Sequence, residues 1–311
     1  MKLSFVIPCY NSEKTIKTVV DEIVSQSELL SHDFEIILVN DFSKDGTLTV
    51  IKDLCAQNRR IIGLNLSQNF GQPSATMAGF SIASGDLIVY SDDDGQTPID
   101  EVGKLIQKIE DGYDVVFAEF SEKKNSLFQN LGTHLNNMMA SYLMSKPKDI
   151  RNMGNFWACK RYVINEILKC KNPYPYLIGI VLGITKNMAS VPTNHRVRIS
   201  GKSNYTLSKM ISLWLNGFTA FSIKPLRLAS LLGFITALIG FMYIVVLIIN
   251  KLNYPEIPLG YSSIMSAIIF IGGMIMMMLG LIGEYVGRIY ININNKPQFI
   301  IRDSYNCDSL F

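Results

Sequence analysis

The sequence predicts an α/β domain with a mostly parallel, doubly wound sheet, followed by two membrane-spanning helices. In the first 120 residues, short apolar runs rich in β-branched residues alternate regularly with helical stretches, which is the order of a parallel α/β sheet. The runs show almost no polar alternation, as expected of strands covered on both faces. Farther along, residues 228–249 and 264–283 carry no charged side chain. Each is long enough to cross the roughly 30 Å hydrocarbon core of a bilayer as a helix.

The individual elements of the first domain follow from local pattern and turn chemistry. Asp45 and Gly46 are expected to form the turn before the second helix. Thr97 and Pro98 are expected to be the N-cap and the first position of the fourth helix. The expected strands are 3–8, 35–40, 61–66, 86–91 and 114–119, and the expected helices are 12–27, 47–58, 73–84 and 99–112.

Composition and charge exclude several classes of protein. A net charge of +3 over 311 residues is too small to indicate a nucleic-acid-binding protein. The five cysteines are scattered and form no C-x-x-C pair, which argues against a disulfide framework or a zinc site and fits a reducing compartment. The three histidines are isolated, so each is expected to be an ordinary surface or capping residue.

Basic residues predict how the chain lies in a membrane. They flank the two apolar runs on their outer sides, whereas the loop between the runs has Lys251 set against Glu256. The positive-inside rule then places both flanks, and with them both termini, in the cytoplasm. The apolar stretch at the N-terminus is too short for a signal peptide. We therefore expect a cytosolic domain at 1–205, interfacial amphipathic helices at 206–227, a transmembrane hairpin at 228–290 and a cytosolic tail at 291–311.

Three consecutive aspartates, Asp92, Asp93 and Asp94, follow the apolar run of the fourth strand. Asp92 and Asp94 are two residues apart, so on an extended chain they point the same way and Asp93 points elsewhere. A divalent cation would relieve the repulsion between them. Two carboxylates together with diphosphate oxygens make an all-oxygen site that suits Mg²⁺ or Mn²⁺. The alternative is an acidic loop that only caps the next helix, although capping does not require three aspartates.

The ends of the first two strands are polar as well. The first strand ends in the segment Pro8-Cys9-Tyr10-Asn11, and the second ends in Asn40-Asp41. Ligands of such sheets bind beyond the carboxyl ends of the strands. The sequence has neither G-x-G-x-x-G after the first strand nor G-x-x-x-x-G-K-[ST], so a glycine-rich loop does not grip a dinucleotide or triphosphate here. Asp41 either accepts a hydrogen bond from a nucleobase ring N–H or simply forms a turn.

Six segments, in order, resemble the motifs of family 2 inverting glycosyltransferases of the polyprenyl-phosphate type. This group includes dolichol-phosphate mannose synthase and the bacterial undecaprenyl-phosphate sugar transferases. The segments are VIPCYNSE, VNDFSKDGT, SQNFGQPSATMAGF, SDDDGQTP, RISGKSNY (198–205) and LGLIGEYVGRIY (279–290). The resemblance runs from residue 3 to about 303. It implies a GT-A fold and inverting transfer of one sugar from a nucleoside-diphosphate sugar to polyprenyl phosphate at the cytoplasmic face of the plasma membrane.

The resemblance also implies roles for individual residues. Those implied for the nucleotide pocket are Pro8, Tyr10, Asn11, Asp41 and Asp93. Those implied for the metal are Asp92, Asp94 and Gln96. Those implied for a loop that closes over the phosphates are Arg198, Lys202 and Ser203. Asp41 would contact the base. Asp92, Asp94 and Arg198 would be the catalytic residues. Arginine is suited to this role because its guanidinium fork binds a phosphate better than a point charge does.

The resemblance further implies a UDP-sugar as the favoured donor, with GDP- and dTDP-sugars as alternatives. It implies polyprenyl phosphate and membrane lipid as partners, no nucleic acid, and a homo-oligomer, a tetramer in the family. Five departures leave base and sugar preference open. Asn40, Phe42, Gln68, Trp157 and Asn204 stand where aspartate, glycine, a basic residue, arginine and lysine are frequent.

Other functions are weighed against this one. A processive polysaccharide synthase would need more spans and a Q-x-x-R-W motif, which the sequence lacks, and a nucleotidyltransferase would usually show a glycine-rich, basic first loop. A catalytically silent membrane scaffold and a transferase with another acceptor remain as alternatives. The retained metal-binding residues speak against the scaffold.

Overall fold

The computed structural model describes residues 1–120, 150, 153–173, 175–194, 224–253, 260–293 and 296–307. The chain forms two compact units. One comprises residues 1–207 together with 295–311, and the other comprises residues 208–294. Residues 206–223 of the region expected to form interfacial helices lie outside the described residues.

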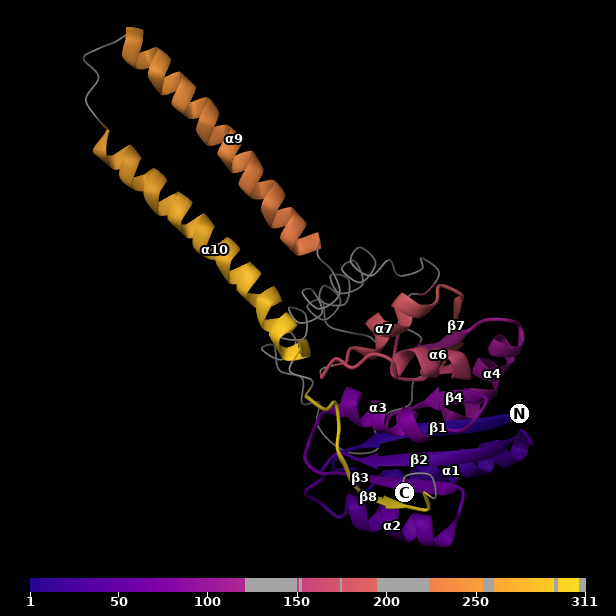
Figure 1. The fold of residues 1–311 in the computed structure, drawn as a ribbon. Helices are drawn as coiled ribbons and strands as arrows, with labels where there is room; N and C mark the ends of the chain where they lie inside the picture. Colours follow the sequence, from indigo (N-terminus) through magenta and orange to yellow (C-terminus); the bar gives the residue numbers. More distant parts are fainter. Residues whose placement is uncertain are drawn as a thin grey trace. The chain divides into compact units, whose positions relative to one another are not determined.

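In the described part of the first unit, eight strands form one mixed sheet in the order β7-β5-β6-β4-β1-β2-β3-β8 (Figure 1). The strands are β1 (Lys2–Cys9), β2 (Asp33–Asn40), β3 (Ile61–Leu66), β4 (Leu87–Tyr90), β5 (Val115–Phe120), β6 (Trp157–Lys160), β7 (Met188–Thr193) and β8 (Ile301–Tyr305). β6 and β8 run antiparallel to their neighbours, and the other pairs are parallel. The predicted α/β class with a mostly parallel sheet is therefore confirmed.

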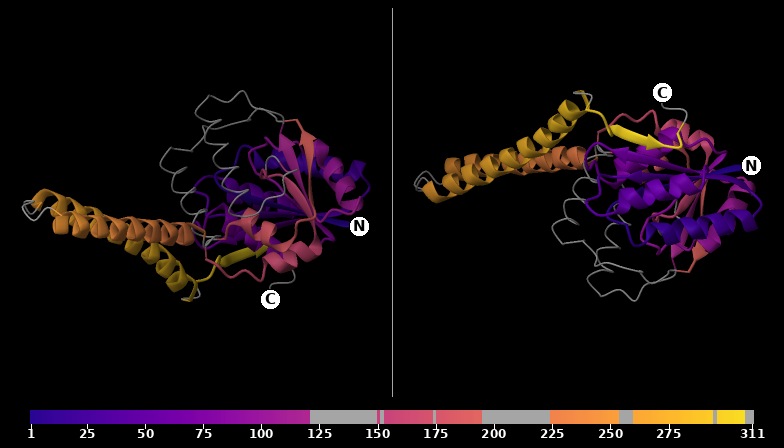
Figure 2. Two further views of the ribbon diagram at one scale, coloured as in Figure 1. Left: turned by 90° about the horizontal axis from the view of Figure 1, so that it is seen from above. Right: turned by 90° about the horizontal axis from the view of Figure 1, so that it is seen from below.

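Helices cover both faces of this sheet (Figure 2). They are α1 (Ile16–Leu29), α2 (Thr47–Gln57), α3 (Gln72–Ile82), α4 (Val102–Glu110), α6 (Arg161–Ile167) and α7 (Leu177–Ile184), with a short 3-10 helix η1 (Ile99–Glu101) before α4. α1, α2 and α4 bury their apolar side chains in one core cluster, and α3, α6 and α7 bury theirs in another. Every strand and helix expected in the first 120 residues is present, with boundaries moved by a few residues.

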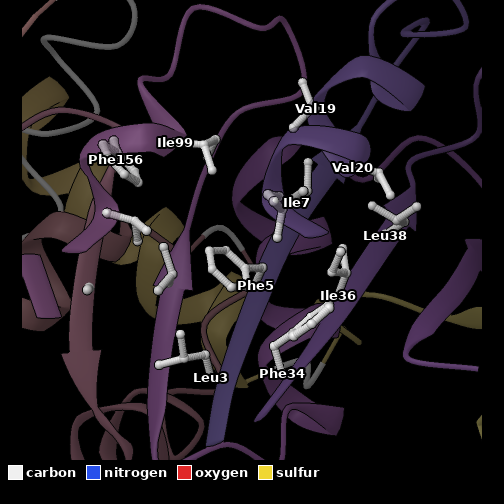
Figure 3. Close-up of a cluster of buried hydrophobic side chains, with 14 of the residues drawn as sticks. Leu3, Phe5, Ile7, Val19, Val20, Phe34, Ile36, Leu38, Ile99 and Phe156 are labelled. Atoms are coloured by element: carbon white, nitrogen blue, oxygen red, sulfur yellow. The ribbon is translucent and has the colours of Figure 1, made fainter. Parts of the chain in front are cut away.

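The strands are apolar on both sides because each face packs against helices. Along β1, Leu3, Phe5 and Ile7 enter the cluster drawn in Figure 3, and Val6 enters the opposite one. The second layer is packed closely, because a β-carbon at Gly79 of α3 would collide with the side chain of Val6. Burial on both faces explains why these strands read as continuous apolar runs.

One predicted helix start is wrong. Pro98 precedes η1 and has a ψ of 81°, so it is not the first helical residue, and no side chain caps this helix. The carbonyl of Thr97, instead of its hydroxyl, accepts the N–H of Ile99. Thr97 is buried, and the chain turns tightly here before it enters the helix.

The C-terminal segment, expected to be a tail, contributes β8 to the sheet. β8 pairs antiparallel with β3, from Gly63 opposite Tyr305 to Leu66 opposite Ile301. The N–H of Ser67 donates to the carbonyl of Ile300. The chain therefore enters this unit at the carboxyl end of β3 and runs back along the edge of the sheet.

The described residues of the second unit form two long helices, α9 (Lys224–Asn253) and α10 (Tyr261–Ile293), which contact each other. Within the described residues, α10 is the helix whose length and composition allow it to cross a membrane. Its segment Phe270–Gly287 has 18 residues and a mean hydropathy of 1.6, and none of it is buried in the protein. α9 contains a shorter apolar stretch, Gly233–Tyr243.

A first prediction concerns the anchoring of β8 by Asn306. Its side-chain nitrogen donates to the carbonyls of Cys55 at 2.6 Å, Ile61 at 2.9 Å and Asn58 at 3.3 Å, and its φ is 55°. Asn306→Gly keeps this backbone conformation available but removes the hydrogen bonds. We expect it to lower the free energy of unfolding by about 1–2 kcal/mol and to speed amide exchange in β8.

Ser31→Gly is the matched control, because Ser31 has a φ of 54° and lies in an exposed turn. It should leave β8 exchange unchanged and should not lower stability. Equal stability and equal exchange for Asn306→Gly and the unmodified protein would show that Asn306 does not anchor the strand.

Candidate active site

The candidate site lies where β1, β2 and β4 end at one edge of the sheet. Several hydrogen bonds join the loops that follow β1 and β2, among them two that Glu13 makes with Asp45 and Gly46. The N–H of Asp41 donates to the carbonyl of Cys9 at 2.9 Å. The N–H of Asn11 donates to Ser43 Oγ at 3.0 Å, and Asn11 Oδ1 accepts the N–H of Lys44 at 2.9 Å. Asn11 has a φ of 55°, a conformation that asparagine tolerates better than most residues. Asn11 thus connects the two loops.

Asp41 is held by the start of the third helix. Its two carboxylate oxygens accept the N–H groups of Phe70 at 2.7 Å and Gly71 at 2.8 Å. The side chain is only 2% exposed. Burial raises the pKa of Asp41, and the two N–H groups oppose that rise. Asp41 therefore fixes the N-terminus of α3 against β2, and its predicted contact with a nucleobase stays a prediction.

Asp92 is held by two neutral amides from distant parts of the chain. Gln72 Nε2 donates to one carboxylate oxygen at 2.7 Å, and Asn155 Nδ2 donates to the other at 3.1 Å. Gln72 also donates to the hydroxyl of Tyr90 at 2.9 Å. The first residue of α3, the end of β4 and the segment before β6 thus converge on this carboxylate.

Asp93 and Asp94 make different contacts. Asp93 Oδ2 accepts the N–H of Tyr10 at 3.0 Å, so Asp93 turns toward β1 whereas Asp92 turns toward α3 and β6. Asp94 Oδ1 accepts the N–H of Gln96 at 3.0 Å, which closes the turn after the three aspartates. The expectation that Asp93 points away from Asp92 agrees with this geometry.

The surroundings of Asp92 and Asp93 raise the pKa of both carboxyl groups. Burial raises the pKa of Asp92 to about 7; the hydrogen bond from Asn155 opposes the rise, and the charges of Asp94 and Asp93 add to it. Burial also raises the pKa of Asp93, against the hydrogen bond from Tyr10. By contrast, the buried Glu35 at the opposite edge has an ion pair with Lys2 at 2.6 Å. Its pKa is lowered, because hydrogen bonds from Lys2, Ser4 and Ser84 outweigh the effect of burial.

The carboxylate oxygens at this end of the sheet fit a hard cation that takes its other ligands from water and substrate. In the part of the chain that the structure describes, no three His, Cys, Asp or Glu side chains are grouped to hold a metal ion. Magnesium typically takes one or two carboxylates and completes its shell with water and substrate phosphates. The carboxylates of Asp92 and Asp94 have this chemistry, and the pKa of Asp92, which burial raises to about 7, fits a carboxylate whose charge a cation would stabilise.

Trp157 packs in a cluster of aromatic side chains next to the end of β4, where the three aspartates begin. It is 2% exposed, and its ring centroid lies 5.7 Å from that of Tyr90, 5.9 Å from that of Phe80 and 6.1 Å from that of Phe117. Tyr90 and Trp157 also pair across β4 and β6. Tryptophan at this position, where arginine is usual, therefore belongs to the core below Asp92.

Asn40 has a structural explanation as well. Its Nδ2 donates to Asn65 Oδ1 at 2.8 Å, and Asn65 Nδ2 donates to Asp303 Oδ2 of β8 at 2.7 Å. An aspartate at position 40 could not donate to Asn65. The amide at position 40 is therefore matched to the carboxylate that β8 brings to this edge.

The structure brings together only part of the predicted site. Tyr10, Asn11, Asp41 and the three aspartates lie at one edge, and Pro8 is buried within β1 one residue before its end. Gln96 is half-buried in the turn after Asp94, and its predicted role at the metal stays a prediction. Arg198, Lys202 and Ser203 lie outside the described residues.

Sequence reasoning missed Gln72 and Asn155. Both are exposed amides that only the folded chain brings to Asp92. Gln72 stands inside the quoted segment SQNFGQPSATMAGF, and Asn155 stands two residues before Trp157. Their position beside motif residues was the one signal that could have identified them.

An α/β sheet with an acidic carboxyl edge and no glycine-rich loop after β1 argues against a dinucleotide-binding domain. Residues 4–168 match the model of glycosyl transferase family 2, and residues 224–289 match that of the GtrB C-terminal hairpin. The chain belongs to glycosyl transferase family 2.

Relatives of known name cover nearly the whole chain. The SfII prophage-derived bactoprenol glucosyl transferase of Shigella flexneri is 32% identical over 98% of this chain and 99% of its own length. The undecaprenyl-phosphate 4-deoxy-4-formamido-L-arabinose transferase of Yersinia pestis is 33% identical over 97% of this chain and 93% of its own. The predicted family resemblance is confirmed.

Solved structures share the fold. Glucosyl-3-phosphoglycerate synthase from Mycobacterium tuberculosis, in complex with Mn²⁺, UDP and glucosyl-3-phosphoglycerate, has a TM-score of 0.52 and 19% sequence identity. The alignment covers 70% of this chain and 77% of that one. The expected GT-A type of sheet domain is therefore confirmed.

A second prediction concerns Asn155. Asn155→Ala removes one of the two amides that orient Asp92, and the residue is exposed, so the fold should persist. We expect kcat/KM for sugar transfer to fall about tenfold, the lower end of what loss of a group supporting a metal ligand costs. Steady-state kinetics with a matched melting curve measures both effects.

Asn187→Ala is the control. Asn187 is an exposed amide that donates to the carbonyl of Gly112 at 3.0 Å, and it lies at the amino end of β7, away from the carboxyl ends of β1, β2 and β4. It should keep full activity. An Asn155→Ala enzyme as active as Asn187→Ala would exclude a role for Asn155 in orienting Asp92.

Proposed function

We propose that this protein transfers one sugar, with inversion, from a nucleoside-diphosphate sugar to polyprenyl phosphate at the cytoplasmic face of the plasma membrane. The observation that carries the proposal is one chain with two parts. A family 2 domain has Asp92, Asp93 and Asp94 at the carboxyl ends of its strands. It is followed in the chain by two long helices that match the GtrB C-terminal hairpin. The product would be a lipid-linked sugar for cell-envelope glycan assembly or modification.

The relatives support the acceptor more strongly than the sugar. The Shigella and Yersinia enzymes are similar to this chain to nearly the same degree, and their names give different sugars but in each case a polyprenol carrier. The shared element is the lipid, so polyprenyl phosphate is the acceptor we propose. The homo-oligomer stays a prediction.

The donor site uses the carboxyl edge of β1, β2 and β4. We place the diphosphate beside Asp92 and Asp94 and the nucleoside toward Tyr10, Asn11 and the loop after β2. The structural neighbour in complex with Mn²⁺ and UDP supports a UDP-sugar with a divalent cation. Held by Asp92 and Asp94, Mg²⁺ or Mn²⁺ would supply Lewis-acid neutralisation of the charge on the leaving diphosphate.

The residues of the chain have a positioning task in this reaction. Gln72 and Asn155 hold Asp92, and the N–H of Tyr10 holds Asp93, so the carboxylates are oriented before the donor arrives. The acceptor needs no obligatory protein base, since a phosphate monoester has a second pKa of about 6 and is already anionic at neutral pH. Placing that oxygen in line behind the anomeric carbon is then the main requirement.

The pairing of β8 with β3 supports a membrane hairpin. Residues 61–66 and 301–305 belong to one sheet, so they share a compartment. The chain between them must therefore cross a membrane an even number of times. If α10 crosses, a second crossing lies before it, and α9 is a helix of 30 residues at that place. We infer that α9 and α10 both span the membrane and that both termini are cytoplasmic, as the basic residues predict.

A third prediction tests the proposed reaction. Asp94→Asn should abolish transfer of sugar from UDP-sugars to undecaprenyl phosphate, by about three orders of magnitude or more, while the melting temperature stays within a few degrees. Asp94 lies in a turn beyond β4 and adds little to the core. The assay is run across a Mn²⁺ titration. Near-native turnover of the variant at saturating Mn²⁺ would remove Asp94 from the mechanism, and a parent protein inactive with every donor would favour the silent scaffold.

A fourth prediction tests the topology. In a background without native cysteines, Ser263→Cys should react with an impermeant thiol reagent in intact cells, and Ser309→Cys should be protected until the cells are opened. This follows from an even number of crossings with the catalytic domain inside. The reverse pattern would overturn the orientation. If both cysteines react in intact cells, or both are protected, the two positions lie on the same side of the membrane, which would contradict the hairpin.

A further inference from the structure

Phe42 combines two features that are costly for a fold. Its φ is 58°, the left-handed region that disfavours residues with a β-carbon and is rarest for bulky ones. Its side chain is 43% exposed, so it contributes little to the core. Among the described residues, the other non-glycine positions with positive φ are small and polar: Asn11, Ser31 and Asn306. Phe42 is thus the bulky exception.

The place of Phe42 in the fold suggests why this strain persists. Phe42 follows Asp41 at the end of β2, and the parallel pairing of β1 with β2 puts its loop beside that of Tyr10, which is 48% exposed. The loop is held on both sides of Phe42, since Asp41 is bound by Phe70 and Gly71, and Ser43 accepts the N–H of Asn11. Strain that a rigid surrounding maintains is characteristic of functional sites.

We propose that Phe42 is a nucleobase-binding residue whose ring stacks on the base of the donor. This inference rests on the proposed function, because it assumes a nucleoside-diphosphate donor at this edge. A flat ring held on a rigid loop beside the donor site matches the flat face of a base, and base–aromatic stacking tolerates different bases. Glycine, usual at this position in the family, would relieve the strain and give up this contact.

The proposal predicts opposite effects on stability and on binding. Phe42→Gly should raise the melting temperature, because glycine adopts a φ of 58° without strain. It should also raise the Kd for UDP in the presence of Mn²⁺ about tenfold, within the range seen for the loss of one stacked base. Binding of Mn²⁺ with inorganic pyrophosphate, which has no base, should not change. Calorimetric titration of the full-length protein in detergent measures these affinities.

Three further variants separate the ring from the backbone. Phe42→Ala removes the ring but keeps the strain, so it should bind UDP as weakly as Phe42→Gly without the gain in stability. Phe42→Tyr should bind UDP like the parent. Ser31→Gly relieves a φ of 54° in a turn before β2, at the other edge of the sheet, and should leave the Kd for UDP unchanged.

Several outcomes would overturn the proposal. Normal UDP affinity in both Phe42→Ala and Phe42→Gly excludes stacking, and weak binding in Phe42→Gly alone assigns the effect to loop flexibility. If these variants change the oligomeric state but bind UDP with unchanged affinity, the Phe42 ring belongs to a protein interface and not to the nucleotide site. If the parent protein binds Mn²⁺ with pyrophosphate but binds none of UDP, GDP and dTDP, then the proposed nucleoside-diphosphate donor is wrong, and the proposal for Phe42 is wrong with it.

Discussion

The parallel pairing of β1 with both β2 and β4 is the constraint on which the candidate site depends. Parallel strands end at the same edge, so residues about 30 and 80 positions apart in the chain meet there. The hydrogen bond from the N–H of Tyr10 to Asp93 and that from the N–H of Asp41 to the carbonyl of Cys9 exist only in this arrangement. The acidic edge is therefore a product of topology, and the packing of helices on both faces keeps it rigid.

The elements of the first 120 residues could be predicted because their signals are local. The strands from β1 to β5 are apolar runs bounded by turns, and burial on both faces makes such runs continuous. β6, β7 and β8 were missed because they are short or contain polar residues, as in Arg302 and Asp303 of β8. Their pairing partners lie far away in the sequence, so pairing and not local pattern makes them strands.

The site divides in the same way. Asp41 and the three aspartates could be placed because the strand order determines where strand ends meet. Gln72 and Asn155 could not, since an exposed amide has no pattern of its own and gains meaning only from the carboxylate it reaches. The family comparison flagged Asn40 and Trp157 as unusual but could not explain them. The structure matches Asn40 to Asn65 and Asp303 of the returning chain, and Trp157 to the aromatic core below Asp92.

The return of β8 to the sheet also sets an order for biosynthesis. Residues 301–305 leave the ribosome after both helices of the hairpin, so β3 remains an open edge while those helices are being synthesised. Open edges are sites of aggregation, and domains otherwise begin to fold as soon as they emerge. The sheet of this domain can thus be completed only after the hairpin has been made. A nascent chain arrested before residue 301 would expose β3, which would make it a substrate for chaperones and proteases rather than a free cytosolic enzyme.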